Sequence, residues 1–470
     1  MPRKNRAEFV VVANRLPVDR VLGPDGEETW RTSPGGLVAA LEPVMQGVDG
    51  AWVGWAGQAD AEIEPFTADG IRLIPVRISA QEVEEYYEGF ANDTIWPLYH
   101  DVIAPPQYHR EWWDAYERVN RRFAETAAEA TAQGGTVWVH DYQLQLVPAL
   151  LRELRPDLTI GYFHHIPFPA HGLYAQLPWR DQVLNGLLGA DVVGFQRAQD
   201  AVYFLTAVRR RLRYEVRGSH VTTPDGRTVL AKGFPISIDT TPYLELAQRP
   251  DVLARAAEIR EELGNPGRIL LGVDRLDYTK GIRHRIKAYG ELIAQGRLAV
   301  GDVTFVQVAV PSRERVDSYA QLRDEIELSV GRLNGDYDTM HHTAIRYLHR
   351  SFPRDEMVAL YLAADVMLVT ALRDGMNLVA KEYVATRADN RGVLVLSEFT
   401  GAADELRQAV RVNPHDIEGM KDAIMTAVEM TPAEQGRRMR ALRKKVLDHD
   451  VNAWSSEFLD ALDTVRGTAR

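Results

Sequence analysis

The chain has 470 residues, a length that usually corresponds to two or three domains. Hydrophobic residues make up 45% and charged residues 26%, which is typical of soluble globular proteins rather than disordered ones. The formal net charge of −11 argues against a general binder of nucleic acid or of a membrane surface. The absence of cysteine excludes disulfides, thiolate catalysis and cysteine-ligated metal sites.

The start of the chain is charged and runs directly into a β-branched segment, without the hydrophobic region of a secretory signal. No stretch approaches 18 apolar residues, so the sequence predicts no membrane-spanning segment. We therefore expect a cytoplasmic protein.

Strand and helix patterns alternate along the whole chain. Short apolar runs, typical of strands buried on both faces of a parallel sheet, form two series. The first series covers 9–14, 136–141, 158–165 and 191–196, and the second covers 268–275, 303–310, 365–370, 392–397 and 409–414. The alternation predicts an α/β fold with right-handed crossovers.

The segment 319–335 shows the pattern of the intervening helices. One helical face carries Leu322, Ile326, Val330 and Leu333, and the pair Asn334-Gly335 predicts the end of the helix.

The region between the two series predicts the domain boundary. Residues 213–233 have the pattern of a hairpin with a Pro-Asp-Gly turn, and a charged helical stretch follows. We predict two doubly wound, Rossmann-like domains over 1–240 and 241–450, and a C-terminal helix over 451–470 that can cross back to the first domain. Ligands of such sheets bind beyond the carboxyl ends of the strands, so we expect the site in a cleft between facing domains.

Polar and charged residues follow several of these strands directly. They are Asn14-Arg15, Asp141, His164-His165, Arg275, Arg313 and Arg373-Asp374. A single arginine in such a place is commonly a surface ion pair. Four of them suggest anionic ligands, because a guanidinium group matches the oxygens of a phosphate.

The segment 274–281 places Arg275 and Lys280 five residues apart, at a tight turn before a helix. Two cations beside the free N–H groups of a helix start indicate a site for a diphosphate. The alternative is a capped helix with solvated charges.

The segment 372–382 turns through Gly375 into a helix that carries Asp374 and, eight residues later, Glu382. Because eight residues are slightly more than two turns, we expect both carboxylates on one side of the helix. Such acceptors suit the hydroxyl groups of a sugar and a ribose. The alternative is that Asp374 only caps the helix.

Weaker signals lie near the N-terminus. The pair Gly35-Gly36 opens a helix and lets a phosphate or a sugar approach the backbone, although it is neither a dinucleotide fingerprint nor a Walker A motif. Tyr87 and Trp96 lie in an aromatic-rich stretch, which is either part of the core or a wall for a sugar.

Taken together, the motifs resemble the trehalose-6-phosphate synthases, glycosyltransferase family 20, which are retaining enzymes of the two-Rossmann GT-B type. The resemblance covers nearly the whole chain. It rests on the strings ANRLPV, GGL, WVGWAG, EYYEGFANDTIWPLYH, VWVHDYQLQLVP, IGYFHHIPFP, DVVGFQ, DRLDYTKG, PSRERV, GRLNG and LRDGMNLVAKEY, in that order.

The resemblance implies transfer of glucose from a nucleoside-diphosphate glucose to glucose 6-phosphate, giving α,α-trehalose 6-phosphate. It implies that glucose 6-phosphate is bound by Arg15, Tyr87, Trp96, Asp141 and Arg313. It implies that the nucleotide sugar is bound by Gly35, Gly36, His165, Arg275, Lys280, Phe352, Asp374, Gly375, Met376, Asn377, Leu378, Val379, Ala380, Lys381 and Glu382. The implied catalytic residues are Arg275, Lys280, Asp141, His165 and Asp374.

Within these sets, the resemblance assigns the acceptor phosphate to Arg15 and Arg313, and the donor ribose to Glu382. The resemblance also implies that Phe352 lies near the donor base and that Trp96 and His165 take part in selection of the α-anomer. We expect no cofactor and no metal, because the nucleoside-diphosphate glucose is a co-substrate. A homodimer or homotetramer is expected by analogy.

The positive charges near the expected donor site predict how the leaving group is stabilised. The departing nucleoside diphosphate gains negative charge, which Arg275 and Lys280 can stabilise. No pair of carboxylates suggests a retaining glycosidase mechanism, so we expect substitution on one face, with the leaving phosphate taking the acceptor proton.

Three alternatives remain at this point. They are a pseudo-glycosyltransferase that joins a nucleotide-activated cyclitol to an amino-cyclitol phosphate, a non-catalytic synthase-like regulator, and a nicotinamide oxidoreductase. The base of the donor and the contacts of the segment 18–32, expected to be a loop, stay open.

Overall fold

The computed structural model describes residues 6–22, 28–32, 38, 41, 45, 49–313 and 316–468. The chain divides into two compact units. The first comprises Met1–Ile236 together with Asn452–Arg470, and the second comprises Ser237–Val451. The sequence prediction placed this division at 240. The predicted α/β class, with parallel sheets, is confirmed.

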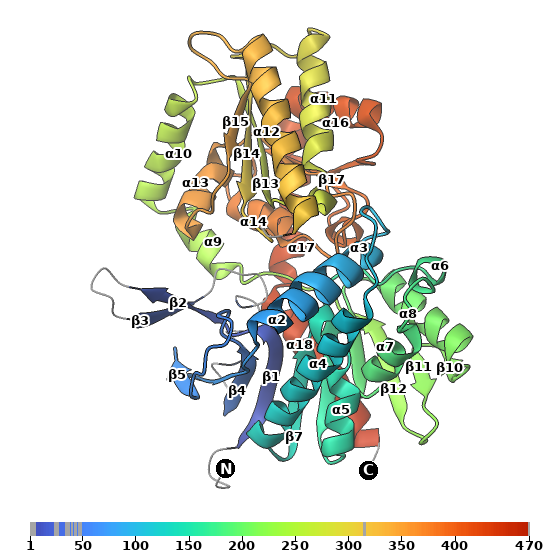
Figure 1. Cartoon of the computed structure of the whole chain (residues 1–470). Helices are drawn as coiled ribbons and strands as arrows, with labels where there is room; N and C mark the ends of the chain where they lie inside the picture. Colours follow the sequence, from blue (N-terminus) through green and yellow to red (C-terminus); the bar gives the residue numbers. More distant parts are fainter. Residues whose placement is uncertain are drawn as a thin grey trace. The chain divides into compact units, whose positions relative to one another are not determined.

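Within the described residues, the first unit has a ten-stranded sheet in the order β10-β11-β12-β9-β8-β7-β1-β4-β6-β5 (Figure 1). In this order, the strands from β12 across to β6 all run parallel to one another. At the two edges of the sheet, β5 on one side and β10 and β11 on the other pair antiparallel. The strands are β1 (Ala7–Arg15), β4 (Gly50–Trp55), β5 (Phe66–Ala68), β6 (Ile71–Pro75), β7 (Thr131–His140), β8 (Thr159–His164), β9 (Val192–Phe195), β10 (Glu215–Arg217), β11 (His220–Thr222) and β12 (Thr228–Gly233).

Helices cover this sheet because each has an apolar stripe at helical spacing. On α4 the stripe includes Trp113, Tyr116, Phe123 and Ala127, all buried. The helices are α2 (Ala80–Glu82), the π-helix η2 (Val83–Ile95), α3 (Trp96–Tyr99), α4 (Arg110–Ala130), η3 (Tyr142–Leu144), α5 (Val147–Leu154), α6 (His171–Tyr174), α7 (Arg180–Leu187), α8 (Ala198–Arg211) and α18 (Val451–Thr468).

The C-terminal helix α18 supplies part of the core of the first unit. The Trp454 ring lies 5.3 Å from Trp138, and the Phe458 ring stacks on Trp138 at 4.6 Å. A Cβ atom added at Gly161 or at Gly194 would lie 2.7 or 2.8 Å from the Phe458 ring. Only glycine at these two positions lets the helix approach the sheet so closely.

The second unit has a six-stranded parallel sheet in the order β15-β14-β13-β16-β17-β18. Counted along the chain this order is 3-2-1-4-5-6, which is the order of the Rossmann fold. The strands are β13 (Arg268–Arg275), β14 (Val303–Val310), β15 (Ile345–Leu348), β16 (Val366–Val369), β17 (Val393–Ser397) and β18 (Val410–Val412).

Helices also pack on the second sheet. Leu292 of α11, Ile326 of α12 and Ile424 of α16 share one buried cluster with the strands. The helices are α9 (Thr241–Leu246), α10 (Pro250–Glu262), η4 (Tyr278–Lys280), α11 (Ile282–Ala294), α12 (Asp317–Tyr337), α13 (Arg354–Ala363), α14 (Leu378–Thr386), α15 (Ala402–Glu405), α16 (Ile417–Glu429) and α17 (Pro432–Asp448).

The predicted apolar face of α12 is confirmed, but its predicted end is wrong. Leu322, Ile326 and Val330 are buried, and Leu333 packs against the same cluster. The helix continues to Tyr337. Asn334 does not end it, because its side-chain amide exchanges two hydrogen bonds with the Ile345 backbone, both of 2.9 Å.

Two further segments differ from the sequence prediction or extend it. The predicted hairpin with its Pro-Asp-Gly turn is confirmed as β11 and β12, and β10 adds a third strand. The segment 18–32 differs from the predicted loop in the residues that the structure describes. It contains the paired antiparallel strands β2 (Val18–Leu22) and β3 (Glu28–Thr32).

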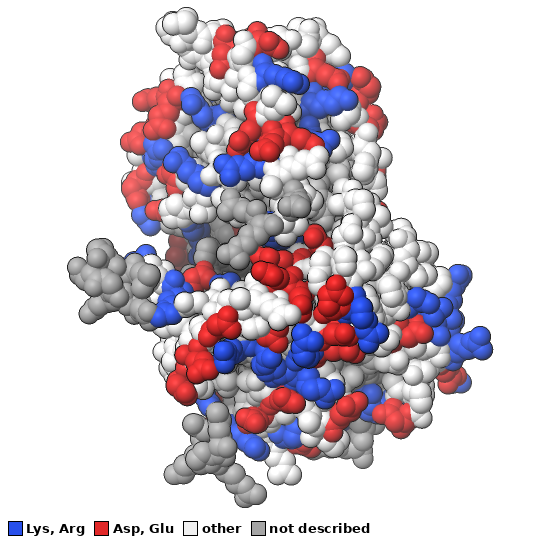
Figure 2. All heavy atoms as spheres, viewed as in Figure 1, with Lys and Arg blue, Asp and Glu red and all other residues white. Residues whose placement is uncertain are grey.

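Within the described part of the chain, no helix is both long enough and apolar enough to cross a bilayer. On the face shown in Figure 2, acidic and basic side chains are interspersed over each unit.

Candidate active site

In the first unit, two predicted site residues lie where the strand order reverses. Arg15 ends β1, and Asp141 follows β7, which is the parallel neighbour of β1. From β1 the chain continues to β4 on one side and later to β7 on the other, so the loops after these strands diverge. The crevice at such a point is the usual ligand site of a doubly wound sheet.

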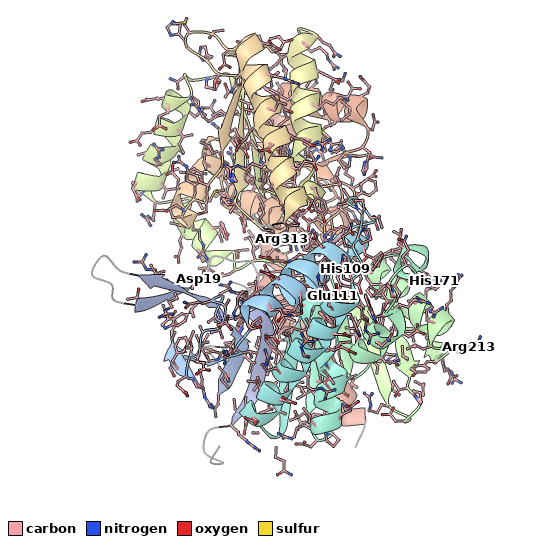
Figure 3. All side chains as sticks on the ribbon, in the orientation of Figure 1. Asp19, His109, Glu111, His171, Arg213 and Arg313 are labelled. Carbon is pink, nitrogen blue, oxygen red and sulfur yellow. The ribbon has the colours of Figure 1, made fainter. Side chains whose placement is uncertain are left out.

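Arg15 is held by an aromatic platform. Its guanidinium carbon lies 5.2 Å from the centre of the Trp55 ring, and the Trp55 ring lies 6.0 Å from that of Tyr87. Arg15 also donates a hydrogen bond of 2.8 Å to Asp19, which Figure 3 labels, and its side chain is 44% exposed. The structure therefore brings Arg15 and Tyr87 together and leaves the guanidinium group accessible.

Asp141 has an unusual backbone conformation, with φ 75° and ψ 170°. This region is nearly confined to glycine and costs about 1–3 kcal/mol for other residues. The conformation is held by the Asp141 N–H, which donates to the Phe163 carbonyl at 2.8 Å. The carboxylate accepts a hydrogen bond of 3.2 Å from the His165 N–H. Strain of this kind commonly occurs at functional sites.

His165 lies beside Asp141, and both of its ring nitrogens have partners. Nε2 lies 3.0 Å from His140 Nδ1, and Nδ1 lies 3.4 Å from Gln196 Nε2. Burial lowers the pKa of His165 to about 3, so its ring is neutral at physiological pH. His140 and Gln196 were not predicted from the sequence.

Trp96 begins α3 directly after the π-helix and is 4% exposed. Its ring lies 4.1 Å from His100 and 5.6 Å from Tyr142. Of the two interpretations of the aromatic stretch, these contacts place Trp96 in the core, whereas Tyr87 is half-buried.

In the second unit, the predicted donor residues again gather where the strand order reverses. Arg275 ends β13, and Asp374 lies beyond the end of the neighbouring strand β16. Lys280 Nζ donates to Asp374 Oδ2 at 2.6 Å, although 94 residues separate the two. Both side chains are largely buried, whereas Arg275 is exposed. One cation is therefore fixed by a carboxylate, and the other faces solvent.

Asp277 joins this group, and the sequence did not single it out. Its carboxylate lies 3.6 Å from an Arg313 nitrogen and accepts a hydrogen bond of 3.2 Å from the Tyr319 hydroxyl. Burial alone would raise the pKa of Asp277, but Arg313, Arg275 and Lys280 outweigh it and hold the pKa at about 2. Arg313, labelled in Figure 3, also donates to Tyr319.

The start of α14 differs from the prediction. The helix begins at Leu378, and its N-cap is Asn377, which accepts a hydrogen bond of 3.2 Å from the Ala380 N–H. Asp374 therefore does not cap the helix. It also does not share a helical face with Glu382, because it precedes the helix and accepts a hydrogen bond of 3.1 Å from the Asn377 amide.

The remaining residues of this segment lie at or near the start of α14. Gly375 and Met376 are buried in the turn, and Leu378 and Val379 are half-buried in the first turn of the helix, where backbone N–H groups lack carbonyl partners within the helix. Together with the macrodipole, such groups favour an anion at this end.

Glu382 and Lys381 point to different partners. The Glu382 carboxylate accepts a hydrogen bond of 2.9 Å from the Tyr361 hydroxyl and another from Tyr243, and burial raises its pKa. Lys381 is buried and donates to Glu405 at 2.7 Å. Lys381 thus forms an internal ion pair rather than extending the group around Lys280.

A fully buried ion pair supports the turn that carries Lys280. Arg285 donates to Asp274 at 2.6 Å, to the Lys280 carbonyl at 2.7 Å and to the Leu368 carbonyl at 2.8 Å. Because Arg285 comes from α11, one residue ties β13, β16 and the turn together. No local pattern indicates this role, since Arg285 is one of several cations on a charged helix.

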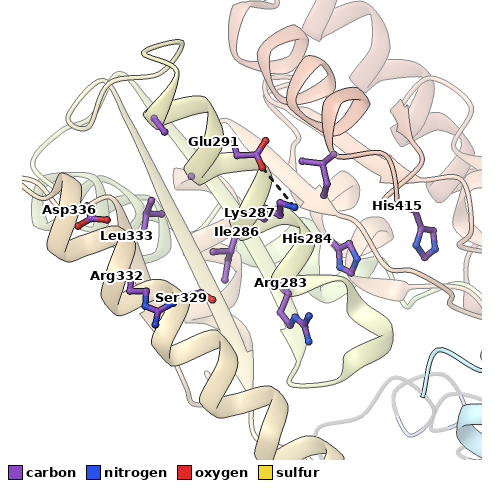
Figure 4. A pocket seen from close by; sticks show the side chains of 13 residues that line it. Arg283, His284, Ile286, Lys287, Glu291, Ser329, Arg332, Leu333, Asp336 and His415 are labelled. Atoms are coloured by element: carbon purple, nitrogen blue, oxygen red, sulfur yellow. Dashed lines mark ion pairs between the residues drawn. The ribbon is translucent and has the colours of Figure 1, made fainter. Parts of the chain in front are cut away.

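Three predictions lie apart from these groups or cannot be compared with them. Gly35 and Gly36 are outside the described residues. Phe352 lines a cavity of about 320 Å³, with Arg350 over its ring at 4.7 Å. A larger groove of about 660 Å³ runs along α11 and contains none of the predicted site residues; Figure 4 shows its lining, with Lys287 paired to Glu291.

Among the described residues, no group of three or more His, Asp or Glu side chains could hold a metal ion. The expectation that no metal or cofactor is needed stays a prediction.

Comparison with known proteins identifies the family. A model of glycosyltransferase family 20 matches residues 7–464. The trehalose-6-phosphate synthase of Mycobacterium avium (strain 104) is 58% identical over 468 residues, which cover 97% of this chain and 95% of the relative.

Two solved structures are also similar. One is an α,α-trehalose-phosphate synthase (UDP-forming) from Burkholderia xenovorans in complex with glucose 6-phosphate. It has a TM-score of 0.88 and 32% identity, and covers 97% of this chain and 100% of that one. The other, from E. coli, is bound with UDP-2-fluoro glucose. It has a TM-score of 0.87 and 33% identity, and covers 97% and 98% of the two chains.

Two doubly wound units, each with its polar residues where the strand order reverses, agree with these matches, and the protein is a glycosyltransferase of the GT-B type. The chain belongs to glycosyltransferase family 20, and the resemblance found in the sequence is confirmed.

Proposed function

We propose that this protein transfers glucose from a nucleoside-diphosphate glucose to glucose 6-phosphate, with retention of configuration, and releases α,α-trehalose 6-phosphate. The observation that carries the proposal is the pairing of Lys280 with Asp374 at the switch point of the second unit. A cation for a diphosphate and a carboxylate for sugar hydroxyls are thereby adjacent, as a nucleotide sugar requires. The E. coli relative was solved with UDP-2-fluoro glucose, a molecule of this class.

The donor side is supported by charge. Arg275, Lys280 and the start of α14 supply positive potential on one side of the second sheet. When the glucosyl bond breaks, negative charge develops on the leaving phosphate, and preorganised cations stabilise it most strongly at that moment. Arg275 is exposed and can contact the diphosphate directly, whereas Lys280 must share its ammonium group between Asp374 and the phosphate.

The acceptor side is supported by Arg15, Tyr87 and Asp141. Arg15 offers an accessible guanidinium group for a phosphate, and Asp141 offers a carboxylate for sugar hydroxyls. Arg313, which the resemblance assigns to the same phosphate, is held by Asp277 and Tyr319 in the second unit. The Burkholderia xenovorans relative was solved with glucose 6-phosphate.

In the proposed mechanism, the C1–O bond of the donor breaks, and its electron pair stays on the leaving diphosphate. The acceptor's anomeric hydroxyl attacks C1 from the same face and passes its proton to that phosphate. The chain's own residues then bind, orient and stabilise charge, and no side chain needs to form a covalent bond with the sugar.

The test is an end-point assay of the purified protein with glucose 6-phosphate and UDP-, ADP- or GDP-glucose in parallel. We expect release of nucleoside diphosphate and a product with two α-anomeric signals in the proton NMR spectrum. The same assay settles the base of the donor. If the folded protein turns over none of the three donors, the glucose reaction is wrong, and the cyclitol or regulatory alternative takes its place.

Gly57 provides a test of the role of Arg15. Gly57 has φ +86°, and a Cβ atom there would lie 2.2 Å from an Arg15 guanidinium nitrogen. We expect Gly57→Ala to displace Arg15 and to raise the KM for glucose 6-phosphate at least tenfold, with a smaller effect on the KM for the donor. Initial rates at varied concentrations of each substrate measure this difference.

Gly70→Ala is the matched control. Gly70 has a similar φ of +77°, but nothing lies within 4 Å of its added Cβ. Both substitutions therefore carry the same backbone strain, while only the first reaches Arg15. Equal KM values for glucose 6-phosphate in the two variants would show that Arg15 does not bind the acceptor.

A further inference from the structure

A row of hydrogen bonds runs through the buried side of His165 in the first unit. It joins the Ile236 backbone, the Gln196 side chain, the His165 ring and the His140 ring. Ile236 N lies 3.0 Å from Gln196 Oε1, Gln196 Nε2 lies 3.4 Å from His165 Nδ1, and His165 Nε2 lies 3.0 Å from His140 Nδ1. Gln196 is 3% exposed and His140 is fully buried, so water does not replace these partners.

The direction of every bond in the row follows from its first member. A backbone N–H can only donate, so the Ile236 N–H fixes the oxygen of the Gln196 amide as acceptor and leaves the NH₂ group facing His165. That group donates to His165 Nδ1, which must then carry no proton. The proton of the neutral His165 ring lies on Nε2 and is donated to His140 Nδ1.

The row ends inside the core. His140 accepts at Nδ1, so its own proton lies on Nε2, where no partner exists among the described residues. The surroundings are aromatic, with the Trp138 ring at 4.7 Å and the Phe163 ring at 6.5 Å. A buried donor without a partner costs free energy of folding, so the arrangement is not the one that stability alone favours.

We propose that His140 and Gln196 are positioning residues, which together fix His165 in a single tautomer and ring orientation beside Asp141. His165 then has no free ring nitrogen with which to exchange a proton with a substrate. Its contribution is to shape the site and, through its backbone N–H, to hold the Asp141 carboxylate at 3.2 Å. The prediction that His165 is catalytic is thereby narrowed to a role in binding and orientation.

Burial lowers the pKa of His165, which agrees with this arrangement. A charged ring carries an N–H on both nitrogens, and the N–H on Nδ1 would then face the NH₂ donor of Gln196 instead of an acceptor. Burial and the neighbouring His165 likewise lower the pKa of His140 well below its usual value. The proposal concerns His165, which the resemblance assigns to the nucleotide sugar, and through its backbone N–H the acceptor residue Asp141. It rests on the proposed function for its kinetic consequence only.

The test uses NMR of the full-length protein labelled with ¹⁵N histidine, without substrate. Correlations within each ring distinguish the two neutral tautomers, and His165→Gln and His140→Gln variants assign the signals. We expect both rings to carry the proton on Nε2. A His165 ring protonated on Nδ1, or an equal mixture of tautomers, would overturn the proposal whether or not the protein makes trehalose 6-phosphate.

Two substitutions at His140 separate positioning from packing. His140→Asn keeps an acceptor oxygen near the position of Nδ1. His140→Leu removes the acceptor and fills the same space with an apolar side chain. We expect the Leu variant to keep the proton on His165 Nε2, because Gln196 still sets the tautomer, but to shift the His165 ring signals, because that proton loses its acceptor. We expect its kcat/KM for glucose 6-phosphate to fall roughly 10- to 100-fold, as when an outer-shell partner is lost. We expect the Asn variant to retain the wild-type tautomer and most of the activity.

Gln196→Met tests the row from its other end and does not depend on the folding of the His140 variants. It removes the donor to His165 Nδ1 with little change in volume, and here we expect mixed tautomers at His165. Unchanged His165 signals in both Gln196→Met and His140→Leu would overturn the proposal. Failure of the proposed function is recognised separately, as absence of turnover in a wild-type protein whose tautomers are as expected.

Discussion

Replacing Lys280 by methionine is expected to lower kcat for the nucleoside-diphosphate glucose roughly 100- to 1,000-fold, the usual effect of removing one preorganised donor from a developing anion. Methionine keeps the length of the side chain but removes the charge that, in the proposed mechanism, faces the leaving phosphate. The side chain of Lys280 is held by Asp374 at 2.6 Å, so its charge is already in place when the glucosyl bond breaks. Release of nucleoside diphosphate at saturating substrate measures the effect.

Lys287→Met is the control for this experiment. Lys287 lies on α11, is exposed and has Glu291 at 3.9 Å, so its removal takes the same charge from the same unit. We expect its kcat to stay close to that of the wild type. If Lys280→Met and Lys287→Met are equally active, while circular dichroism shows both to be folded, Lys280 does not stabilise the leaving group.

The largest effect on stability is expected for Arg285→Met, at about 3–5 kcal/mol, because it leaves a buried carboxylate without its partner. Arg285 and Asp274 are 0% and 3% exposed, and burial already raises the pKa of Asp274 to about 6 despite the neighbouring cations. Urea unfolding followed by tryptophan fluorescence measures the loss. Arg283→Met, on the same helix but in an exposed pair with Glu325, should cost less than about 1 kcal/mol.

A second variant separates the fold from the site. In Asp274→Leu/Arg285→Met both charges are gone, so we expect most of the lost stability to return. Turnover should stay low, since the Lys280 carbonyl still lacks the Arg285 donor that held it at 2.7 Å. A double variant with normal kcat would show that Arg285 serves stability alone.

The sequence was most informative where chemistry follows a strand directly. Arg15, Asp141 and Arg275 were found by this rule, because parallel strands bring their carboxyl ends to one edge of a sheet whatever the loops do. The structure places all three beside the strands where the order reverses. The apolar runs likewise predicted the strands at the centre of each sheet, since period and length are local properties of the chain, but they missed β4, β5 and β6 of the first sheet and β15 of the second.

Interactions between distant parts of the chain could not be predicted in this way. At the start of α14, Asp374 and Asn377 are both residue types that favour the N-cap position. Contacts with other parts of the chain decide which of them caps the helix. The Asp374 N–H donates to the Phe399 carbonyl at 3.2 Å, and Lys280 holds its carboxylate, so the helix begins later, at Leu378. Tyr319 and Gln196 carry no local signal, because their roles depend on partners contributed by other elements.

The position of α18 has a consequence for the synthesis of the protein. Trp454 and Phe458 complete the core around Trp138, Gly161 and Gly194, yet they are translated after the entire second unit. The first unit therefore emerges from the ribosome with an aromatic face still uncovered. The second unit can fold before the core of the first unit is complete. The N-terminal half of the polypeptide reaches its mature state only when α18 has left the exit tunnel.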